Sequence, residues 1–360
     1  MIEIDGSIGE GGGQVLRTSL ALAAVLRREV RIFNIRAGRA ESGLRAQHLT
    51  SVKAVAQMCG ASPKGVQIGS TEFIFSPGAI KAGSFRFDVG TAGSVTLVLQ
   101  TLMPLLPFSP GTVELEITGG TDVKWSPPID YLRLVTLPLL ERMSFHASIL
   151  VSRRGHYPKG GGIVRLTATP TSVLKNIVGR ERGDVTMISG VSHSMKLPPG
   201  VAERQASAAT RVIEEKRHPD PQIRIEASEN SSHLGPGSGI VLCATTSNGA
   251  VLGADSLGER GRPSEVVGED AARKLSEELG SGAFLDRHMG DMIVPYMALA
   301  EGVSDASVSQ VTLHTLTNVK VAEQVAGVHF DLLLDVGMAG RLRVTGLGLR
   351  REEVSVSPRE

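Results

Sequence analysis

Ile2–Leu26 reads IEIDGSIGEGGGQVLRTSLALAAVL, and this stretch decides the fold class. Apolar and acidic residues alternate over Ile2–Asp5, which predicts a short β-strand. The glycines of Gly6–Gly13 allow a tight turn, and the apolar run Val15–Leu26 is long enough for a buried helix. The stretch therefore predicts a strand, a glycine turn and a helix in succession, which is the start of an α/β unit.

The same order of elements returns about 80 residues later, and such self-similarity is a signal of the fold. The first copy is expected to continue with a strand (Val30–Ile35), a helix (Leu44–Met58) and two alternating segments (Gly65–Gly69 and Glu72–Ser76). The second copy is expected to have strands at Phe85–Val89, Val113–Ile117, His146–Ser152 and Gly162–Thr169, and helices at Val95–Leu106 and Ile129–Met143. Each unit thus has the predicted order strand–helix–strand–helix–strand–strand.

A third, shorter copy is predicted near the end of the chain, after an insertion. Its expected elements are helices at Gly290–Ala300 and Thr317–Gln324 and strands at Ser307–Leu313, His329–Val336 and Leu342–Leu347. We predict that residues 1–182 carry copies one and two, 183–282 an inserted domain, 283–348 the third copy and 349–360 a polar tail.

The insertion is long enough to fold as a small α+β domain of about a hundred residues. Its predicted strands are Val185–Val191, Gln222–Ala227, Gly239–Thr246 and Ala250–Ser256, and its predicted helices are Pro199–Glu215 and Ser264–Leu279.

Composition narrows the class of protein. The chain has 360 residues and a net charge of +1, so no global field draws it to nucleic acid and any such contact must be local. Cys59 and Cys243 are far apart, which predicts small buried side chains in a reducing compartment rather than a disulfide or a metal site. With no apolar run of membrane-spanning length and no signal-peptide pattern, we expect a soluble cytoplasmic protein.

The first candidate site is the glycine-rich turn Gly9–Gln14, which is either a phosphate-binding loop or only a tight turn. It is not a Walker A loop, because the Gly-Lys-Ser/Thr ending is missing. Glu10 in such a loop makes sense if a Mg²⁺ ion bridges its carboxylate to phosphate. Arg17 follows in the next helix, and Arg36 and Arg39 lie beside glycine in a predicted loop, where a phosphate contact is expected.

Three further motifs are chemically ambiguous. Arg154–Gly162 contains three consecutive glycines, which favour either a structural crossing or a ligand contact. His314 is predicted at the end of a strand, before a helix capped by Thr315 or Thr317, where it is a nucleophile, a general base or a satisfied polar group. Asp291 is predicted at a helix start, as a cap, a metal ligand or part of an adenine pocket.

These motifs, taken together, resemble those of RNA 3′-terminal phosphate cyclases and run in the order of that family. The resemblance rests on Asp5–Arg17 (DGSIGEGGGQVLR), Ile35–Arg39 with Gln47-His48, Gly119–Asp122 with Pro127-Pro128, Arg154–Val164 (RGHYPKGGGIV) and Leu313–Asn318 (LHTLTN). It implies an α/β fold of three βαβαββ repeats, like the C-terminal domain of translation initiation factor three and shared with enolpyruvyl transferases. The inserted domain is implied to be thioredoxin-like.

The resemblance implies an ATP-dependent, ligase-type enzyme that uses Mg²⁺, with Mn²⁺ as an alternative. His314, neutral at its ordinary pKa of about 6.5, is expected to take AMP from ATP and pass it to an RNA 3′-phosphate. The 2′-hydroxyl then closes a 2′,3′-cyclic phosphate and releases AMP. The remaining residues implied by similarity are Gln47, Gln100, Pro127, Asp130, His288 and Asp291 for the adenylate, Arg17, Arg36, Arg39 and His48 for phosphates or the RNA end, and Glu10 for the metal.

One position departs from the family. His288 stands where relatives have a tyrosine that can stack on adenine, which leaves the nucleobase preference open. The alternatives are a non-catalytic ribosome-assembly relative, which lacks the nucleophile, an enolpyruvyl transferase, and a plain RNA-binding module, which the low aromatic content of 4% disfavours. We expect RNA with a 3′-phosphate and ATP as partners, and a monomer or homodimer.

Overall fold

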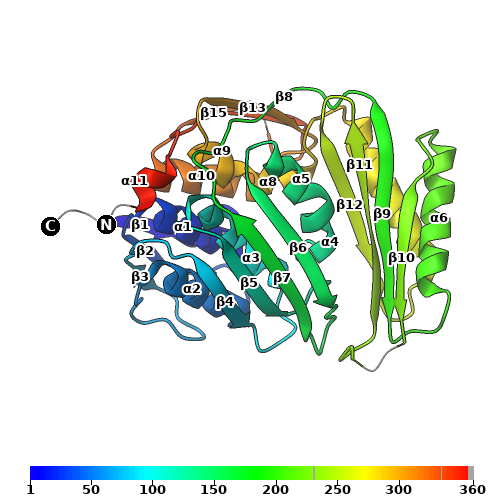
Figure 1. Ribbon diagram of the computed structural model, residues 1–360, viewed down its shortest axis with the longest axis horizontal. Helices are drawn as coiled ribbons and strands as arrows, with labels where there is room; N and C mark the ends of the chain where they lie inside the picture. The colour runs from blue at the N-terminus through cyan, green and yellow to red at the C-terminus, as the bar shows by residue number, and fades with distance from the viewer. Residues whose placement is uncertain (230–231, 334, 356–360) are drawn as a thin grey trace.

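Four β-sheets form in the part of the chain that the computed structural model describes, residues 1–229, 232–333 and 335–355 (Figure 1). The protein is a mixed α/β structure. The first sheet has the order β1 (Ile2–Asp5), β2 (Val30–Phe33), β3 (Phe73–Phe75). The second has the order β4 (Gly83–Asp88), β5 (Val113–Gly119), β7 (Gly162–Thr169), β6 (His146–Arg153), and the third β8 (Val178–Gly179), β13 (Val303–Val308), β15 (Gly340–Thr345), β14 (Phe330–Leu333).

These three sheets share one pairing pattern. In each, the first two strands are parallel, and the next strand across the sheet runs antiparallel to them. Parallel neighbours need a crossover, which helices supply. These crossovers contain α1 (Gly13–Leu26), α3 (Val95–Leu102) with the 3₁₀ turn η1 (Met103–Phe108), and α8 (Arg287–Met292) with α9 (Val294–Leu299). The helices between the other strands are α2 (Ala46–Cys59), α4 (Ile129–Tyr131), the π-helical η2 (Leu132–Thr136), α5 (Leu137–Glu141) and α10 (Leu313–Ala326).

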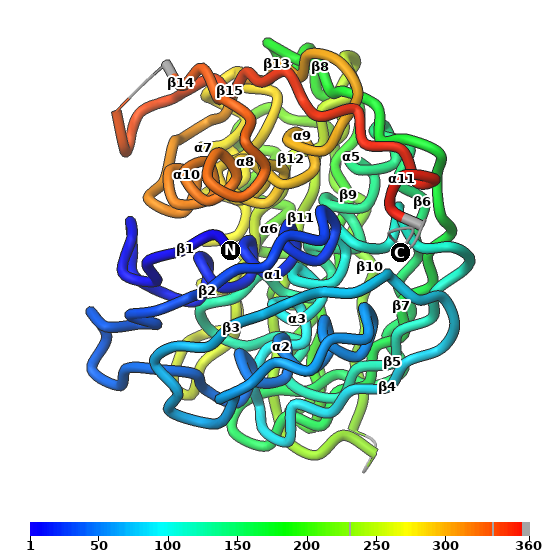
Figure 2. Tube along the Cα trace, turned by 90° about the vertical axis from the view of Figure 1, so that its left-hand side faces the viewer, coloured from blue at the N-terminus to red at the C-terminus, as the bar shows by residue number. Residues whose placement is uncertain are grey.

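Helix α1 is the centre of the core. Every residue from Val15 to Val25 is buried, and a helix that is apolar all round belongs inside a protein. It packs against α2, α3, α9 and α10, which connect strands of all three sheets. Figure 2 shows α1 between α10 and α3, with the sheets outside. The helices therefore form a shared interior, and their N-termini can meet.

The fourth sheet is built from the insertion and has the order β10 (Gln222–Ser228), β9 (Val185–Met195), β11 (Gly237–Thr246), β12 (Val251–Leu257). Helices α6 (Val201–Glu215) and α7 (Ser264–Gly280) cover one face, and α4 and η2 meet the other (Figure 1). Since β8 precedes the insertion and pairs with β13 after it, the insertion interrupts the crossover of the third sheet.

A buried carboxylate ties the fourth sheet to the core. Asp286 accepts hydrogen bonds from the Tyr131 hydroxyl at 2.6 Å and from the Gly253 backbone N–H at 2.8 Å, and it also caps α8. Burial raises the pKa of Asp286 to about 6. Three segments that are distant in sequence therefore meet at one side chain.

Several sequence expectations need correction. The strand predicted at Ser307–Leu313 is wrong, because β13 ends at Val308 and the Thr312–Thr315 capping box starts α10 at Leu313. His314 is thus in the first helical turn rather than at a strand end. Gly65–Gly69 forms no strand, since both glycines have left-handed backbone, with φ of +78° and +84°.

At the end of the chain, part of the predicted polar tail is the short helix α11 (Arg351–Ser355), and residues 356–360 lie outside the described part. Both cysteines are buried and free, as predicted. Among the described residues, no helix has both the length and the apolar character needed to cross a membrane.

The contact between α6 and α7 depends on a glycine. A Cβ added at Gly268 would lie 1.9 Å from the backbone oxygen of Gln205, whereas one added at Gly280 meets nothing within 4 Å. Gly268→Ala should lower the free energy of unfolding by about 1–3 kcal/mol through overpacking. Gly280→Ala, in the same helix, should leave it unchanged or slightly raised. Denaturant unfolding of both variants checks this, and equal effects would contradict the packing argument.

Candidate active site

The glycine-rich turn before α1 packs closely against other side chains. Gly9 has φ +65°, and a Cβ there would lie 2.0 Å from the Thr317 hydroxyl of α10. A Cβ on Gly13 would lie 2.4 Å from Nε2 of His48 and 2.9 Å from an Arg17 guanidinium nitrogen. Only glycine fits at these positions, so the turn brings backbone, a cation and an imidazole into close contact.

His314 lies in the first turn of α10, beside this loop. Its Nδ1 is 3.5 Å from one carboxylate oxygen of Glu10, and the other oxygen accepts a hydrogen bond from Arg39 at 2.6 Å. The side chain of His314 is 45% exposed, so it can be reached from solvent. Partial burial lowers the pKa of His314, Glu10 opposes the shift, and Arg17 adds to it, so the imidazole is neutral at pH 7.

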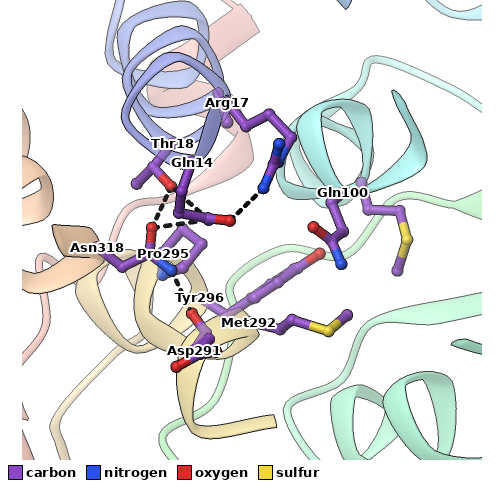
Figure 3. Close-up of a pocket in the computed structure, with 11 residues that line it drawn as sticks. Gln14, Arg17, Thr18, Gln100, Asp291, Met292, Pro295, Tyr296 and Asn318 are labelled. Carbon is purple, nitrogen blue, oxygen red and sulfur yellow. Dashed lines mark hydrogen bonds between the residues drawn. The ribbon is translucent and has the colours of Figure 1, made fainter. Parts of the chain in front are cut away.

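Hydrogen bonds join α1 to α10, and α10 to α8 (Figure 3). The Oδ1 atom of Asn318 accepts from the Gln14 amide at 2.8 Å and from the Thr18 hydroxyl at 2.6 Å. Its Nδ2 donates to the backbone oxygen of Asp291 at 2.6 Å. Arg17 in turn donates to the Gln14 side chain. This network fixes the relative positions of the two helix starts.

A small cavity opens between α1, α3, α8, α9 and α10. Figure 3 shows Arg17, Gln100 and Asp291 facing it, with the Tyr296 ring between the last two. Burial lowers the pKa of Arg17 to about 10, which leaves it cationic at neutral pH. The lining residues are Gln14, Arg17, Thr18, Ala21, Gln100, Met103, Asp291, Met292, Pro295, Tyr296 and Asn318. Apolar walls with a few convergent polar groups are features of small-molecule sites, but the open space of about 20 Å³ is far below the usual volume of such sites.

Asp291 is a nearly buried carboxylate on this wall. Its Oδ1 accepts hydrogen bonds from the hydroxyls of Thr312 and Thr315, both at 2.6 Å. Burial nevertheless raises the pKa of Asp291 to about 7, against the effect of these hydrogen bonds. The residue therefore anchors the first turn of α10, the turn that carries His314.

His48 is buried and neutral. Its Nδ1 accepts the backbone N–H of Arg45 at 3.1 Å, which leaves the proton on Nε2, the atom that faces Gly13. Burial and the neighbouring arginines lower its pKa to about 3. His48 can therefore donate a hydrogen bond toward the glycine turn at any physiological pH.

The other residues predicted for the site are more dispersed. Gln47 accepts the backbone N–H of Ser94 at the start of α3, and the Pro127 backbone oxygen accepts the Thr96 hydroxyl at 2.7 Å. Arg36, with a left-handed φ of +56°, donates to the backbone oxygen of Gly43, and its pKa is lowered by burial first and then by Arg45 and Arg39.

Asp130 and His288, like Gln47 and Pro127, were predicted for the adenylate and lie outside the cavity lining. Asp130 is fully buried and accepts hydrogen bonds from Arg154 and pairs with Arg133, both at 2.6 Å. His288, in α8, packs edge-on against the Tyr131 ring. The structure brings Glu10, Arg17, Arg39, His48 and His314 together, while Gln100 and Asp291 line the cavity.

Sequence reasoning missed the polar residues that organise this region. Gln14 and Asn318 lie within the quoted motifs but had no assigned role, and Thr317 was expected only as an alternative helix cap, whereas the cap is Thr312. Gln14 and Arg17 are three residues apart and therefore share a helix face, which is the signal that could have identified Gln14. Asn318 and Thr317 are found only once α10 is placed against α1.

A magnesium ion is implied by the resemblance, and the donor set can be tested against it. Mg²⁺ in proteins takes oxygen ligands, often one or two carboxylates completed by substrate phosphates and water. Glu10 supplies one carboxylate at the glycine turn, although Arg39 already contacts one of its oxygens. The residues present fit an ion that shares its ligands with a phosphate.

Comparison with known proteins gives a consistent result. A model of the family RNA 3′-terminal phosphate cyclase matches residues 8–332. The chain is 54% identical over 344 residues to an RNA 3′-terminal phosphate cyclase of Ignicoccus hospitalis, covering 95% of this chain and 96% of the relative. Proteins of the same name from Hyperthermus butylicus (53%, covering 92% and 94%) and Pyrobaculum aerophilum (49%, covering 97% and 99%) are similar as well.

The raised pKa of Asp291 makes a prediction about stability. Between about pH 4 and 7 the folded state keeps a proton that the unfolded state releases. The stability from this group is therefore fully present below the ordinary carboxyl pKa and is lost as pH rises toward 7. Relative to Asp291→Asn, the wild type should lose up to about 1.4 kcal/mol per pH unit in this interval.

Denaturant unfolding of the nucleotide-free protein at several pH values checks this. The exposed Asp220 serves as control, because Asp220→Asn should give a curve parallel to that of the wild type. If Asp291→Asn also runs parallel, the carboxyl is not protonated in the fold.

Proposed function

Because the chain belongs to the RNA 3′-terminal phosphate cyclase family, we propose that it is an enzyme converting an RNA 3′-terminal phosphate to a 2′,3′-cyclic phosphodiester at the expense of ATP. The observation that carries this proposal is the accessible, neutral imidazole of His314 beside Glu10, where α10 and the glycine turn of α1 meet. Both helices start there, and the positive ends of their dipoles favour anionic phosphates.

In the first step, a nitrogen of His314 attacks the α-phosphorus of ATP. A nitrogen–phosphorus bond forms, the bond between the α-phosphorus and its bridging oxygen breaks, and pyrophosphate leaves. Nδ1 of His314 faces the Glu10 carboxylate at 3.5 Å, so this nitrogen is the one to carry the proton. We therefore assign the attack to Nε2, whose lone pair is free.

In the second step, an oxygen of the RNA 3′-phosphate attacks the same phosphorus and releases His314, giving an RNA–adenylate. In the third step, the neighbouring 2′-hydroxyl attacks the 3′-phosphorus and loses its proton, and AMP leaves with the bridging oxygen. Because the attacking and leaving groups belong to one molecule, proximity supplies much of the rate.

Cations around the glycine turn suit the phosphates. Arg17, Arg39 and Arg36 can offer guanidinium forks to phosphate oxygens, and Nε2–H of His48 can donate a neutral hydrogen bond. In the apo protein Arg39 is paired with Glu10 and Arg17 with Gln14, so these pairs must exchange partners when the substrate binds.

We assign the adenosine of the adenylate to the cavity beside Arg17. The open space there is about 20 Å³, room for about one water molecule, so the lining side chains must move to admit the nucleoside. Gln100 and Asp291 lie on the cavity wall and can hydrogen-bond to a base or ribose. His288, Gln47, Pro127 and Asp130 are assigned to the same role by similarity; in the structure Gln47 and Asp130 hold neighbouring elements together, so their effect on nucleotide binding is expected to be indirect. Glu10 would hold Mg²⁺, or Mn²⁺ in its place, and the bound ion would offset negative charge on the phosphates.

For the architecture, we infer that the three similarly paired sheets are repeats of one unit, of the kind found in the C-terminal domain of initiation factor three and in enolpyruvyl transferases. Residues 183–282 would then be an inserted domain of thioredoxin-like topology. Support comes from the shared strand order and from the position of the insertion within one crossover.

Covalent labelling tests the nucleophile. Incubation with α-³²P-labelled ATP and Mg²⁺ should give the wild type an acid-labile label, as expected for a phosphoramidate. His314→Ala should lose the label and cyclase activity by at least about a thousandfold, because the nucleophile is gone.

The exposed His329 provides a matched control, and His329→Ala should label like the wild type. A wild type that closes RNA ends without becoming labelled would contradict the mechanism through a nucleotide-bearing His314. A wild type that neither labels nor cyclises would favour a non-catalytic, ribosome-assembly type of role.

The ribose at the RNA end gives a second test. An oligonucleotide with a 3′-phosphate and a terminal 2′-hydroxyl should be cyclised, whereas the same oligonucleotide with a terminal 2′-deoxyribose should accumulate as the adenylate, because the attacking group of the third step is missing. Gel mobility and mass spectrometry distinguish the products. Cyclic product formed without a labelled intermediate in either arm would point to direct transfer.

A further inference from the structure

Two buried histidines from distant parts of the chain face each other where the second and fourth sheets meet. His156 lies in the loop between β6 and β7, and His193 lies on β9. Their Nε2 atoms are 3.2 Å apart, and Nε2 of His193 is 3.9 Å from a carboxylate oxygen of Asp122. One ligand atom from each of the three residues lies within 4.8 Å of the other two, and all three residues are at most 5% exposed.

Strand β11 is shaped to receive both rings. A Cβ on Gly237 would lie 2.1 Å from Cγ of His156, and a Cβ on Gly239 would lie 3.1 Å from Cε1 of His193. The two glycines are two residues apart and so point to the same face of the strand. Any larger side chain at Gly237 would displace the imidazole, so backbone and rings form one fitted cluster.

One hydrogen bond, between the two Nε2 atoms at 3.2 Å, links the rings. Among the described residues, Nδ1 of His156 and Nδ1 of His193 have no hydrogen-bond partner, although both atoms are buried. Nε2 of His193 also faces Asp122. Burial lowers the pKa of both imidazoles, which keeps the ring lone pairs available as ligands.

Asp122 already has hydrogen-bond donors. Arg154 donates to its two carboxylate oxygens at 3.4 and 3.2 Å, and the Thr121 hydroxyl donates to Oδ2 at 2.6 Å. A carboxylate oxygen has two lone pairs, so Oδ2 can still offer one of them to a metal. The positive charge of Arg154 is shared among Asp122, Asp130 and Glu226. It still favours the ionised form of Asp122, which is the form that binds a metal.

We propose that Asp122, His156 and His193 bind one divalent transition-metal ion, with Zn²⁺ as the best match, and that this ion fastens the inserted segment to the rest of the protein. Imidazole nitrogens with a carboxylate oxygen suit zinc, whereas Mg²⁺ prefers oxygen ligands alone. With bonds of about 2.0–2.1 Å, tetrahedral zinc places its ligands about 3.3 Å apart, close to the separations of 3.2 and 3.9 Å found here.

This site is distinct from the one at Glu10, and it does not depend on the proposed function. Asp122 follows β5 and His156 follows β6, whereas His193 belongs to the fourth sheet. A metal held by all three cross-links the two parts of the chain at a point where no disulfide is available. Its expected effect is on stability rather than on the chemistry at His314.

Metal content of the full-length chain, produced without a histidine tag, tests the proposal. The protein is equilibrated with ZnSO₄, dialysed, and analysed by inductively coupled plasma mass spectrometry. The wild type should retain about one Zn²⁺ per chain, and His156→Phe and His193→Gln should each retain less than about a tenth of that. His329→Gln, which removes an exposed histidine, is the matched control and should retain the wild-type amount.

Thermal unfolding gives a second readout that keeps the test decisive if one variant folds poorly. Removing the metal with dipicolinate should lower the wild-type melting temperature by at least about 3 °C, and Zn²⁺ should restore it. His156→Phe, whose ring fills the same space, should not respond to either reagent. A wild type that holds no more Zn²⁺ than His156→Phe, with a melting temperature unaffected by chelator and Zn²⁺, would overturn the proposal and leave the pair as packed imidazoles.

Discussion

The burial of helix α1 is the constraint on which the rest of the structure depends. A helix whose residues from Val15 to Val25 are all inside must be covered on every side, and helices from all three of the similarly paired sheets provide that cover. The first turns of α1 carry Gln14 and Arg17, which line the small cavity. The glycine turn before them is held against α10, and Gly9 is the point of closest approach.

The groups suited to phosphate chemistry lie where two helices begin. The N-termini of α1 and α10 converge, so the backbone N–H groups of their first turns, Arg17 and His314 gather in a region suited to phosphate. The hydrogen bonds from Gln14 and Thr18 to Asn318 lock the two helices in register. Asp291, held by two threonine hydroxyls, fixes the first turn of α10 from the other side. His314 is thereby positioned by packing interactions that it does not itself make.

The spacing of apolar residues and of glycines predicted most strands and helices. Apolar residues repeat with different periods in strands and in helices, and the turns between them carry glycine. These signals failed where local chemistry competes with the pattern: Thr312–Thr315 has the β-branched residues of a strand but forms a capping box, and the left-handed glycines at 65 and 69 break a strand. The resemblance predicted His314, Glu10 and Arg17 as site residues, and the structure places them close together. It could not show that Asp130 is engaged by Arg154, since the two are 24 residues apart and meet only when the segment after β6 packs beside α4.

The position of the insertion explains why such buried polar groups exist. Residues inserted into the crossover between β8 and β13 must leave and re-enter the core without separating two paired strands. A purely apolar junction would hold the fourth sheet without fixing its orientation, whereas directional bonds fix both. Asp286 with Tyr131 and Gly253, and Arg154 with Asp122, Asp130 and Glu226, are two such sets of bonds at the junction. Since buried charges are costly unless fully paired, removing one partner from the set formed by Arg154, Asp122, Asp130 and Glu226 would be strongly destabilising.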